Sequence, residues 1–308
     1  MHGARWYGQE NETGEKNTIV PCRPSRRGLS IISIIHADHP FAYELTVFPE
    51  NSSAGIGNRD ALRTFIHWLA ASTNDGHPGL AALLQEALGQ HSIDLDADPP
   101  PDQPRFLRFR APLALLQAGL QHNEGRAQFH GRAAAPLTGL YIAQSSLDEL
   151  PPPLRRDVPV PALLNRPDVN VYGSSVWLGL EPTYSPWHRD PNPNLLVQLC
   201  GRKEVRLLPP RAGEDLKRRA LLAGRGGGQL LGLRMAGPET MEGRQREALH
   251  EAVWSGPAGT TTTTITKLKI APGDGLYVPQ GWWHSVRSEA SMGELNASDD
   301  LYLDSLSE

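Results

Sequence analysis

Two segments of the chain decide the fold: PTYSPWHRDPNPNLLVQLCGRKEVRLLPP at 182–210 and GDGLYVPQGWWHSV at 273–286. In an extended strand, alternate side chains point to the same face, so His188 and Asp190 share one face. The second segment supplies another imidazole, His284. We therefore expect two strands from distant parts of the chain to place these three side chains around one point.

Two imidazoles and one carboxylate leave half of an octahedron open, which is the arrangement of non-haem Fe(II) oxygenases. An HxD motif alone is a weak signal, but Lys203 lies fifteen residues after His188, past an apolar strand at 195–199 and a tight turn at 200–202. We expect a hairpin that brings Lys203 beside the metal strand. Its compact ammonium could then neutralise the far carboxylate of a dicarboxylate cosubstrate.

The order His188, Asp190, Lys203 and His284 resembles the JmjC branch of the cupin superfamily, the Fe(II)- and 2-oxoglutarate-dependent dioxygenases. Within that branch it is most similar to the group of the asparaginyl hydroxylase that acts on hypoxia-inducible factor. The resemblance covers roughly residues 105–298. It implies that the two histidines and the aspartate hold Fe(II), that Lys203 binds 2-oxoglutarate, and that no catalytic residue is needed beyond the metal ligands.

Three further residues match the family's cosubstrate-binding positions. Ser185 lies three residues before the first ligand, Asn194 lies six residues after it, and Tyr141 matches the family's tyrosine in the upstream segment LYIAQ. The resemblance implies that all three contact 2-oxoglutarate. For Ser185 and Asn194 a role in a turn is the alternative, because the segment around residues 191–194 is rich in proline and asparagine.

An oxygenase needs apolar walls around its metal, and several large side chains near the motif could supply them. The candidates for a substrate pocket are Tyr184, Trp187, Leu196, Trp282 and Trp283. The competing interpretation is that each aromatic side chain belongs to the structural core.

Composition limits the class of protein. A net charge of −4 and a pI of about 6.3 indicate no global attraction to nucleic acid or to an anionic membrane. The counts of 30 glycines and 27 prolines favour short strands joined by turns. Two cysteines cannot form a disulfide framework, which indicates a reducing compartment, the cytoplasm or the nucleus. With no apolar run long enough to span a bilayer, we expect no membrane partner; the oligomeric state stays open.

The 308-residue chain divides into two regions. Residues 1–104 form a leader and a helical region, and an acidic, proline-rich stretch at 94–104 marks the boundary. Residues 105–308 form the cupin-like catalytic domain, which carries a helical insertion at about 211–258. The patterns predict helices at 58–72, 78–88, 112–121, 213–223 and 243–254, and strands at 105–110, 170–180 and 184–189. Residues 29–35 fit either a strand or the start of a buried helix. A second HxD at His36–Asp38 lacks a matching lysine and is interpreted as a turn.

The last strand departs from the family. Asn296-Ala297-Ser298 resembles its beginning, but Asp299 and Asp300 follow where the family has apolar and amide side chains. A further carboxylate near the metal would change the charge of the site and weaken cosubstrate binding.

We therefore expect a mainly β protein with helices, a double-stranded β-helix of the cupin, jelly-roll and JmjC type, with an α-helical N-terminal region. The implied function is Fe(II)- and 2-oxoglutarate-dependent hydroxylation, with O2, of a protein side chain or a tRNA base. Demethylation of an N-methyl-lysine uses the same chemistry and is an alternative. A catalytically impaired cupin that acts as a binding or scaffold module is the alternative from another class.

Overall fold

The computed structural model describes most of the chain. The described residues are 19–21, 40–47, 54–71, 78–96, 106–129, 135–223, 244–255 and 265–304. The apolar segment at 29–35, the motif at His36–Asp38 and Cys22 lie outside the described residues.

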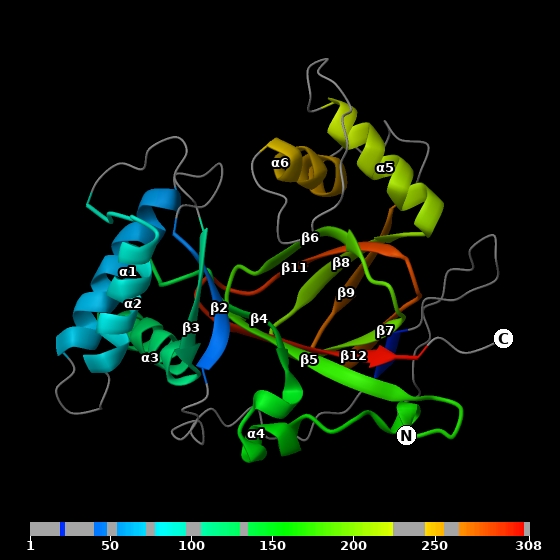
Figure 1. Cartoon of the computed structure of the whole chain (residues 1–308), viewed down its shortest axis with the longest axis horizontal. Coiled ribbons are helices and arrows are strands. Elements are labelled where there is room, and N and C mark those ends of the chain that lie inside the picture. The colour runs from blue at the N-terminus through cyan, green and yellow to red at the C-terminus, as the bar shows by residue number, and fades with distance from the viewer. Residues whose placement is uncertain are drawn as a thin grey trace.

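Two antiparallel sheets form the body of the protein (Figure 1). The larger sheet has the order β1 (Ile19–Pro21), β10 (Asp274–Val278), β7 (Asn194–Cys200), β12 (Leu295–Leu303), β5 (Val171–Leu180), β4 (Leu140–Ser146), β2 (Pro40–Thr46), β3 (Phe106–Pro112). The smaller sheet has the order β6 (Tyr184–Arg189), β11 (Trp283–Ser288), β8 (Lys203–Leu208), β9 (Thr266–Ile270). This architecture confirms the predicted cupin, jelly-roll fold.

The helices lie outside the sheets in two main groups, one beside β2 and β3 and one above β6 and β11 (Figure 1). The first group is α1 (Ala54–Ala71), α2 (Pro78–Gln90) and α3 (Ala114–Phe129), and the second is α5 (Pro210–Ala223), α6 (Arg244–His250) and the π-helix η6 (Glu251–Ser255). Three short helices, η3 (Leu147–Glu149), α4 (Pro152–Asp157) and η4 (Ala162–Leu164), connect β4 to β5. The predicted helices at 58–72 and 78–88 are confirmed. The helix predicted at 112–121 starts later and runs further, because β3 extends through Pro112.

The N-terminal region contributes a strand as well as helices. Strand β2 pairs with β3 on one side and with β4 on the other. One core cluster joins Phe41 and Phe65 of this region to Leu180 and Ala297 of the larger sheet. The division near residue 104 stays a prediction, but the larger sheet runs across it.

The expected hairpin between residues 195–199 and Lys203 is wrong. Strands β7 and β8 belong to different sheets, and β8 pairs with β11 and β9 instead. The chain crosses between the sheets at Gly201, which has a φ of +72° and packs so tightly that an added Cβ would lie 2.5 Å from Asn296 Nδ2. Strand β11 therefore separates β8 from the metal strand β6.

The helical insertion is docked on the outer face of the smaller sheet. Trp254 Nε1 donates to Ser285 Oγ at 3.0 Å, and the guanidinium groups of Arg206 and Arg287 each lie 4.4 Å from the centroid of the Trp254 ring. Glu204 accepts a hydrogen bond from each arginine. Because Ser285 follows His284, the insertion packs directly behind a predicted metal ligand.

Helix α5 approaches the sheet through Gly213. A Cβ at this position would lie 2.3 Å from Cγ and Cδ1 of Trp283, and the Gly213 carbonyl accepts a hydrogen bond from Trp187 Nε1 at 3.3 Å. The two tryptophan rings stack with centroids 6.1 Å apart. The close approach of α5 to the sheet therefore requires glycine at position 213.

We expect Gly213→Ala to destabilise the fold by about 1–3 kcal/mol, because the new methyl group overlaps the fully buried Trp283 ring. Thermal unfolding monitored by circular dichroism measures the change. Gly125→Ala in α3 is the matched control, because a Cβ there meets nothing within 4 Å. Equal melting temperatures for the two variants would contradict the packing described above.

Asp299 lies on the outer face of β12, in register with Val176 and Val197. It is 2% exposed, and its Oδ1 has no hydrogen-bond partner among the residues that the structure describes. Burial, with a smaller contribution from Asp300, raises the pKa of Asp299 to about 8. The carboxyl group is therefore more easily ionised in the unfolded chain than in the folded one.

A raised pKa in the folded state means that the contribution of Asp299 to stability falls as the pH rises from about 4 to about 8. We expect Asp299→Asn to remove this dependence on pH. The melting temperature of the variant, relative to that of the parent, should therefore be higher at pH 8 than at pH 5 by about 4 °C or more. Asp148→Asn, at a side chain that is 88% exposed, is the control. A difference that does not change with pH would refute the assignment.

Candidate metal centre and cosubstrate pocket

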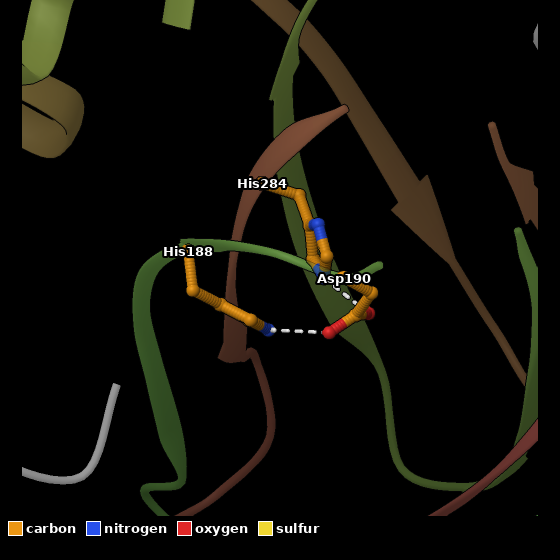
Figure 2. Close-up of side chains that lie close together, drawn as sticks. All are labelled: His188, Asp190 and His284. Atoms are coloured by element: carbon orange, nitrogen blue, oxygen red, sulfur yellow. Dashed lines mark ion pairs between the residues drawn. The ribbon is translucent and has the colours of Figure 1, made fainter. Parts of the chain in front are cut away.

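The predicted metal ligands converge at the end of the smaller sheet (Figure 2). Asp190 lies between the two histidines, with Oδ1 4.0 Å from His188 Nε2 and Oδ2 3.7 Å from His284 Nε2. One ligand atom from each residue can be chosen so that all lie within 4.8 Å of one another. A single cation can therefore contact all three.

Strand register brings the ligands together. His188 of β6 and His284 of β11 are direct partners in the antiparallel pair, and a register shift follows between His284 and Val286. The loop after β6 is held to the turn before β11, because Gly281 N donates to Asp190 O at 3.2 Å and Gln280 Nε2 donates to Pro191 O at 2.8 Å. These hydrogen bonds fix the position of Asp190 beside His188 and His284.

The histidines are oriented for metal binding through Nε2. His188 Nδ1 lies 2.7 Å from the carbonyl oxygen of Pro186, and His284 Nδ1 lies 3.3 Å from that of Trp282. A carbonyl only accepts, so each Nδ1 carries the proton and each Nε2 offers its lone pair. Burial and the nearby His188 lower the pKa of His284 to about 4, which keeps it neutral. The donor set fits Fe(II).

Asn194 orients the carboxylate of the centre. Its Nδ2 donates to Asp190 Oδ2 at 2.7 Å, and its side chain is 2% exposed. The predicted contact between Asn194 and the cosubstrate stays a prediction. The structure gives this amide a different task, which is to hold Asp190 toward the histidines.

A pocket opens beside the metal centre, between the two sheets. It is lined by Tyr141, Trp177, Ser185, His188, Asn194, Leu196, Lys203, Val278, His284, Val286, Ser298 and Asp300. Each of the four residues predicted to bind the cosubstrate therefore lines the same pocket as the two histidines. These residues lie far apart in the sequence, and strands from both sheets bring them together in the fold.

Lys203 enters this pocket from the start of β8. It is 4% exposed, and its Nζ donates to Ser298 Oγ at 2.5 Å. Burial lowers the pKa of Lys203 to about 8, while Asp300 and Glu181 act against that shift. A buried ammonium with one neutral hydrogen-bond partner is a suitable site for a carboxylate.

Tyr141 and Ser185 line the same pocket. The Tyr141 ring lies over Gly179, where a Cβ would come within 2.3 Å of Tyr141 Cδ2. Burial, followed by the charge of Asp300, raises the pKa of Tyr141 well above its usual value. The phenol is therefore kept neutral and can donate a hydrogen bond.

None of the four aromatic candidates, Tyr184, Trp187, Trp282 and Trp283, is among the residues that line this pocket. Trp187 and Trp283 are fully buried in the core between the smaller sheet and the insertion, and Tyr184 packs against His250 and Trp254. Alternation along the strand explains this result, because each of these residues adjoins an inward-facing side chain.

Leu196 lines the pocket as predicted, whereas Trp282 packs in the cluster behind Val278 and Val286. Trp177 also lines the pocket, although no motif in the sequence points to it, and the sequence does not decide which face of the last strand is inward. Ser298 and Asp300 line the pocket, and Asp299 between them does not. The alternation of β12 was visible in the sequence, but its inward face was not.

Because Asn194 orients Asp190, we expect Asn194→Ala to weaken metal binding by about 10–100-fold while the protein remains folded. Calorimetric titration with Mn(II) measures the affinity, and His188→Ala gives the level of a broken centre. Asn192→Ala, on the same loop, is the control, because its amide bonds to Tyr172 Oη instead. An unchanged affinity for Asn194→Ala would show that Asp190 is positioned without it.

Several known proteins are similar to this chain in sequence. A Drosophila melanogaster protein named Jumonji C domain-containing protein 5 is 31% identical over 158 residues, which cover 49% of this chain and 34% of that protein. Lysine-specific demethylase 8 of Danio rerio is 29% identical over 48% of this chain and 33% of its own length. Lysine-specific demethylase JMJ30 of Arabidopsis thaliana is 26% identical over 50% and 32%, respectively.

The matches span about a third of the length of these relatives. A model of the cupin-like domain family matches residues 103–299, which include every residue of the metal centre and nearly all of the pocket. The fold, the metal centre and this match agree: the chain belongs to the cupin-like domain family.

Proposed function

We propose that the protein is an Fe(II)- and 2-oxoglutarate-dependent oxygenase that hydroxylates a macromolecular substrate. The observation that carries the proposal is that the triad of His188, Asp190 and His284 shares one pocket with the buried Lys203. JmjC proteins use Fe(II) and 2-oxoglutarate, and this pocket offers a group for each. The relatives named above support membership of the JmjC group.

Fe(II) and 2-oxoglutarate, when bound, would supply the activation of O2, with one oxygen atom inserted into a C–H bond of the substrate and the other used to convert 2-oxoglutarate into succinate and CO2. The protein's own residues position the reactants. His188, Asp190 and His284 would hold the metal on one side and leave the other open to ligands. Lys203 would bind the distal carboxylate of the cosubstrate, helped by the Tyr141 hydroxyl.

The apolar side chains of the pocket control access of water. Leu196, Val278 and Val286 line it together with the polar groups, and they belong to one core cluster between the two sheets. An apolar lining limits side reactions with solvent and strengthens electrostatic interactions in the site. Hydroxylation in this pocket would therefore be directed to the bound substrate.

A protein side chain is the preferred substrate. The names of the relatives from Danio rerio and Arabidopsis thaliana refer to lysine demethylation, which supports a protein rather than a tRNA base. Closeness to the asparaginyl hydroxylase group rests on the pattern of Lys203 and Tyr141. Hydroxylation of an N-methyl group leads to its loss, so demethylation of methyl-lysine is the second candidate.

The location of the protein follows from the same proposal. None of the described helices has the length and apolar character needed to cross a bilayer. A reducing compartment keeps Fe(II) and the thiol of Cys200 reduced. We infer that the protein acts in the cytoplasm, the nucleus or both.

We expect the purified protein with Fe(II) to release succinate from 2-oxoglutarate, and His188→Ala to remain at background. Lys203→Ala should raise the KM for 2-oxoglutarate at least about tenfold, because the cosubstrate loses its buried cation. Lys269→Ala, whose side chain is 70% exposed on β9, is the matched control and should behave as the parent. Equal, background output from the parent and His188→Ala would favour a non-catalytic cupin.

A further inference from the structure

Asp300 places a second carboxylate in the pocket, opposite the metal-binding sheet. On β12 it is in register with Ser175 of β5 and Leu196 of β7, so it lies in the middle of the larger sheet. It lines the same pocket as His188, His284 and Lys203. The metal ligands come from the smaller sheet, so Asp300 faces the centre from across the pocket.

Several charged and polar groups surround Asp300. Burial raises the pKa of Asp300 to about 7, Lys203 of β8 acts against that shift, and Asp190 after β6 adds to it. Trp177 Nε1 of β5 lies nearby without a well-aligned hydrogen bond. The negative charge of Asp300 also contributes to the raised pKa values of Tyr141 of β4 and Tyr302 of β12. Lys203 is the one cation among the residues that line the pocket. The field of Asp300 therefore acts chiefly on Lys203 and on the anions that Lys203 would bind.

The other carboxylate near Lys203 is already bound elsewhere. Glu181 Oε1 accepts a hydrogen bond from Asn296 Nδ2 at 2.7 Å, so part of its charge is satisfied behind the pocket. Among the groups that act on Lys203, Asp300 has the larger effect and Glu181 the smaller. Lys203 Nζ donates to Ser298 Oγ at 2.5 Å, and Asp300 lies two residues further along the same face of β12, so Asp300 is the carboxylate that lines the pocket beside Lys203.

A count of charges shows the consequence for a dicarboxylate. A divalent metal and Lys203 would bring three positive charges, which Asp190 and a dicarboxylate would balance with both histidines neutral. An ionised Asp300 adds one uncompensated negative charge to that set. A 2-oxo acid without the second carboxylate removes this excess, because Asp300 itself then balances Lys203.

We propose that Asp300 is a specificity-determining residue: as the resident counter-ion of Lys203, it lowers the preference of the pocket for 2-oxo acids that carry a second carboxylate. The inference rests on the proposed function, since it assumes that 2-oxo acids bind at the metal. It assigns the effect to Asp300 alone, because the neighbouring Asp299 lies on the opposite face of β12.

The test measures the binding of two cosubstrate analogues to the full chain loaded with Mn(II) in the absence of oxygen. Calorimetry gives the Kd of 2-oxoglutarate and of 2-oxopentanoate, which has the same carbon chain without the distal carboxylate. We expect Asp300→Asn to tighten 2-oxoglutarate at least about tenfold and to change 2-oxopentanoate by less than about threefold. Asp299→Asn makes the same substitution on the other face of β12, outside the pocket, and should change neither ligand.

Three further measurements keep the outcome decisive. Mn(II) stoichiometry and melting temperature establish that each variant is folded and loaded, and Asp300→Ser replaces Asp300→Asn if the amide does not fold. The same substitution is then made in a Lys203→Met variant. There, Asp300→Asn should give a smaller gain in affinity for 2-oxoglutarate relative to 2-oxopentanoate than it gives when Lys203 is present. Retention of the full selective gain without Lys203 would overturn the counter-ion role.

The failures are distinguishable. Equal tightening of both ligands by Asp300→Asn would show that the carboxylate acts on the metal rather than on Lys203, and it would overturn the inference. Unchanged binding of both ligands would overturn it as well. If Mn(II) binds but neither 2-oxo acid binds to any variant, the proposed function fails, and the inference fails with it.

Discussion

The pairing register of β6 with β11 is the constraint on which the rest of the structure depends. His188 and His284 are direct partners across these antiparallel strands, so their side chains emerge together on the inward face. A slip of one residue would turn one histidine away from the pocket and bring a neighbouring tryptophan inward. The metal centre therefore requires that this register be specified strongly.

The opposite face of the same two strands specifies the register. Trp187 and Trp283 stack there and are fully buried under α5, which approaches closely only because Gly213 has no side chain. Burying two indole rings is worth several kcal/mol, roughly 1.5–3 for each large apolar side chain. Stability on one face and metal geometry on the other are thus two consequences of one strand pair.

The ionisable groups buried near the pocket oppose this stability. Desolvation shifts the pKa of Lys203 downward and those of Asp299 and Asp300 upward, so each is held at an energetic disadvantage as an ion. Groups perturbed by burial and by a specific partner are typical of functional sites. Lys203 and Asp300 fit that description, because both line the pocket. Asp299 does not line it, and the structure shows no task for its carboxyl group.

The sequence by itself predicted the fold class, the candidate metal ligands and most of the pocket, partly because spacing along a strand fixes which side chains share a face and partly through the resemblance to the JmjC family. His188, Asp190 and His284 could be named for that reason, and the amphipathic helices could be located by their periodicity. Only the tertiary structure decided which sheet the strand of Lys203 joins and which face of each strand is inward. Alternation separates Asp299 from Asp300 but does not say which of them meets the pocket, since that choice is made by the packing of one sheet against the other.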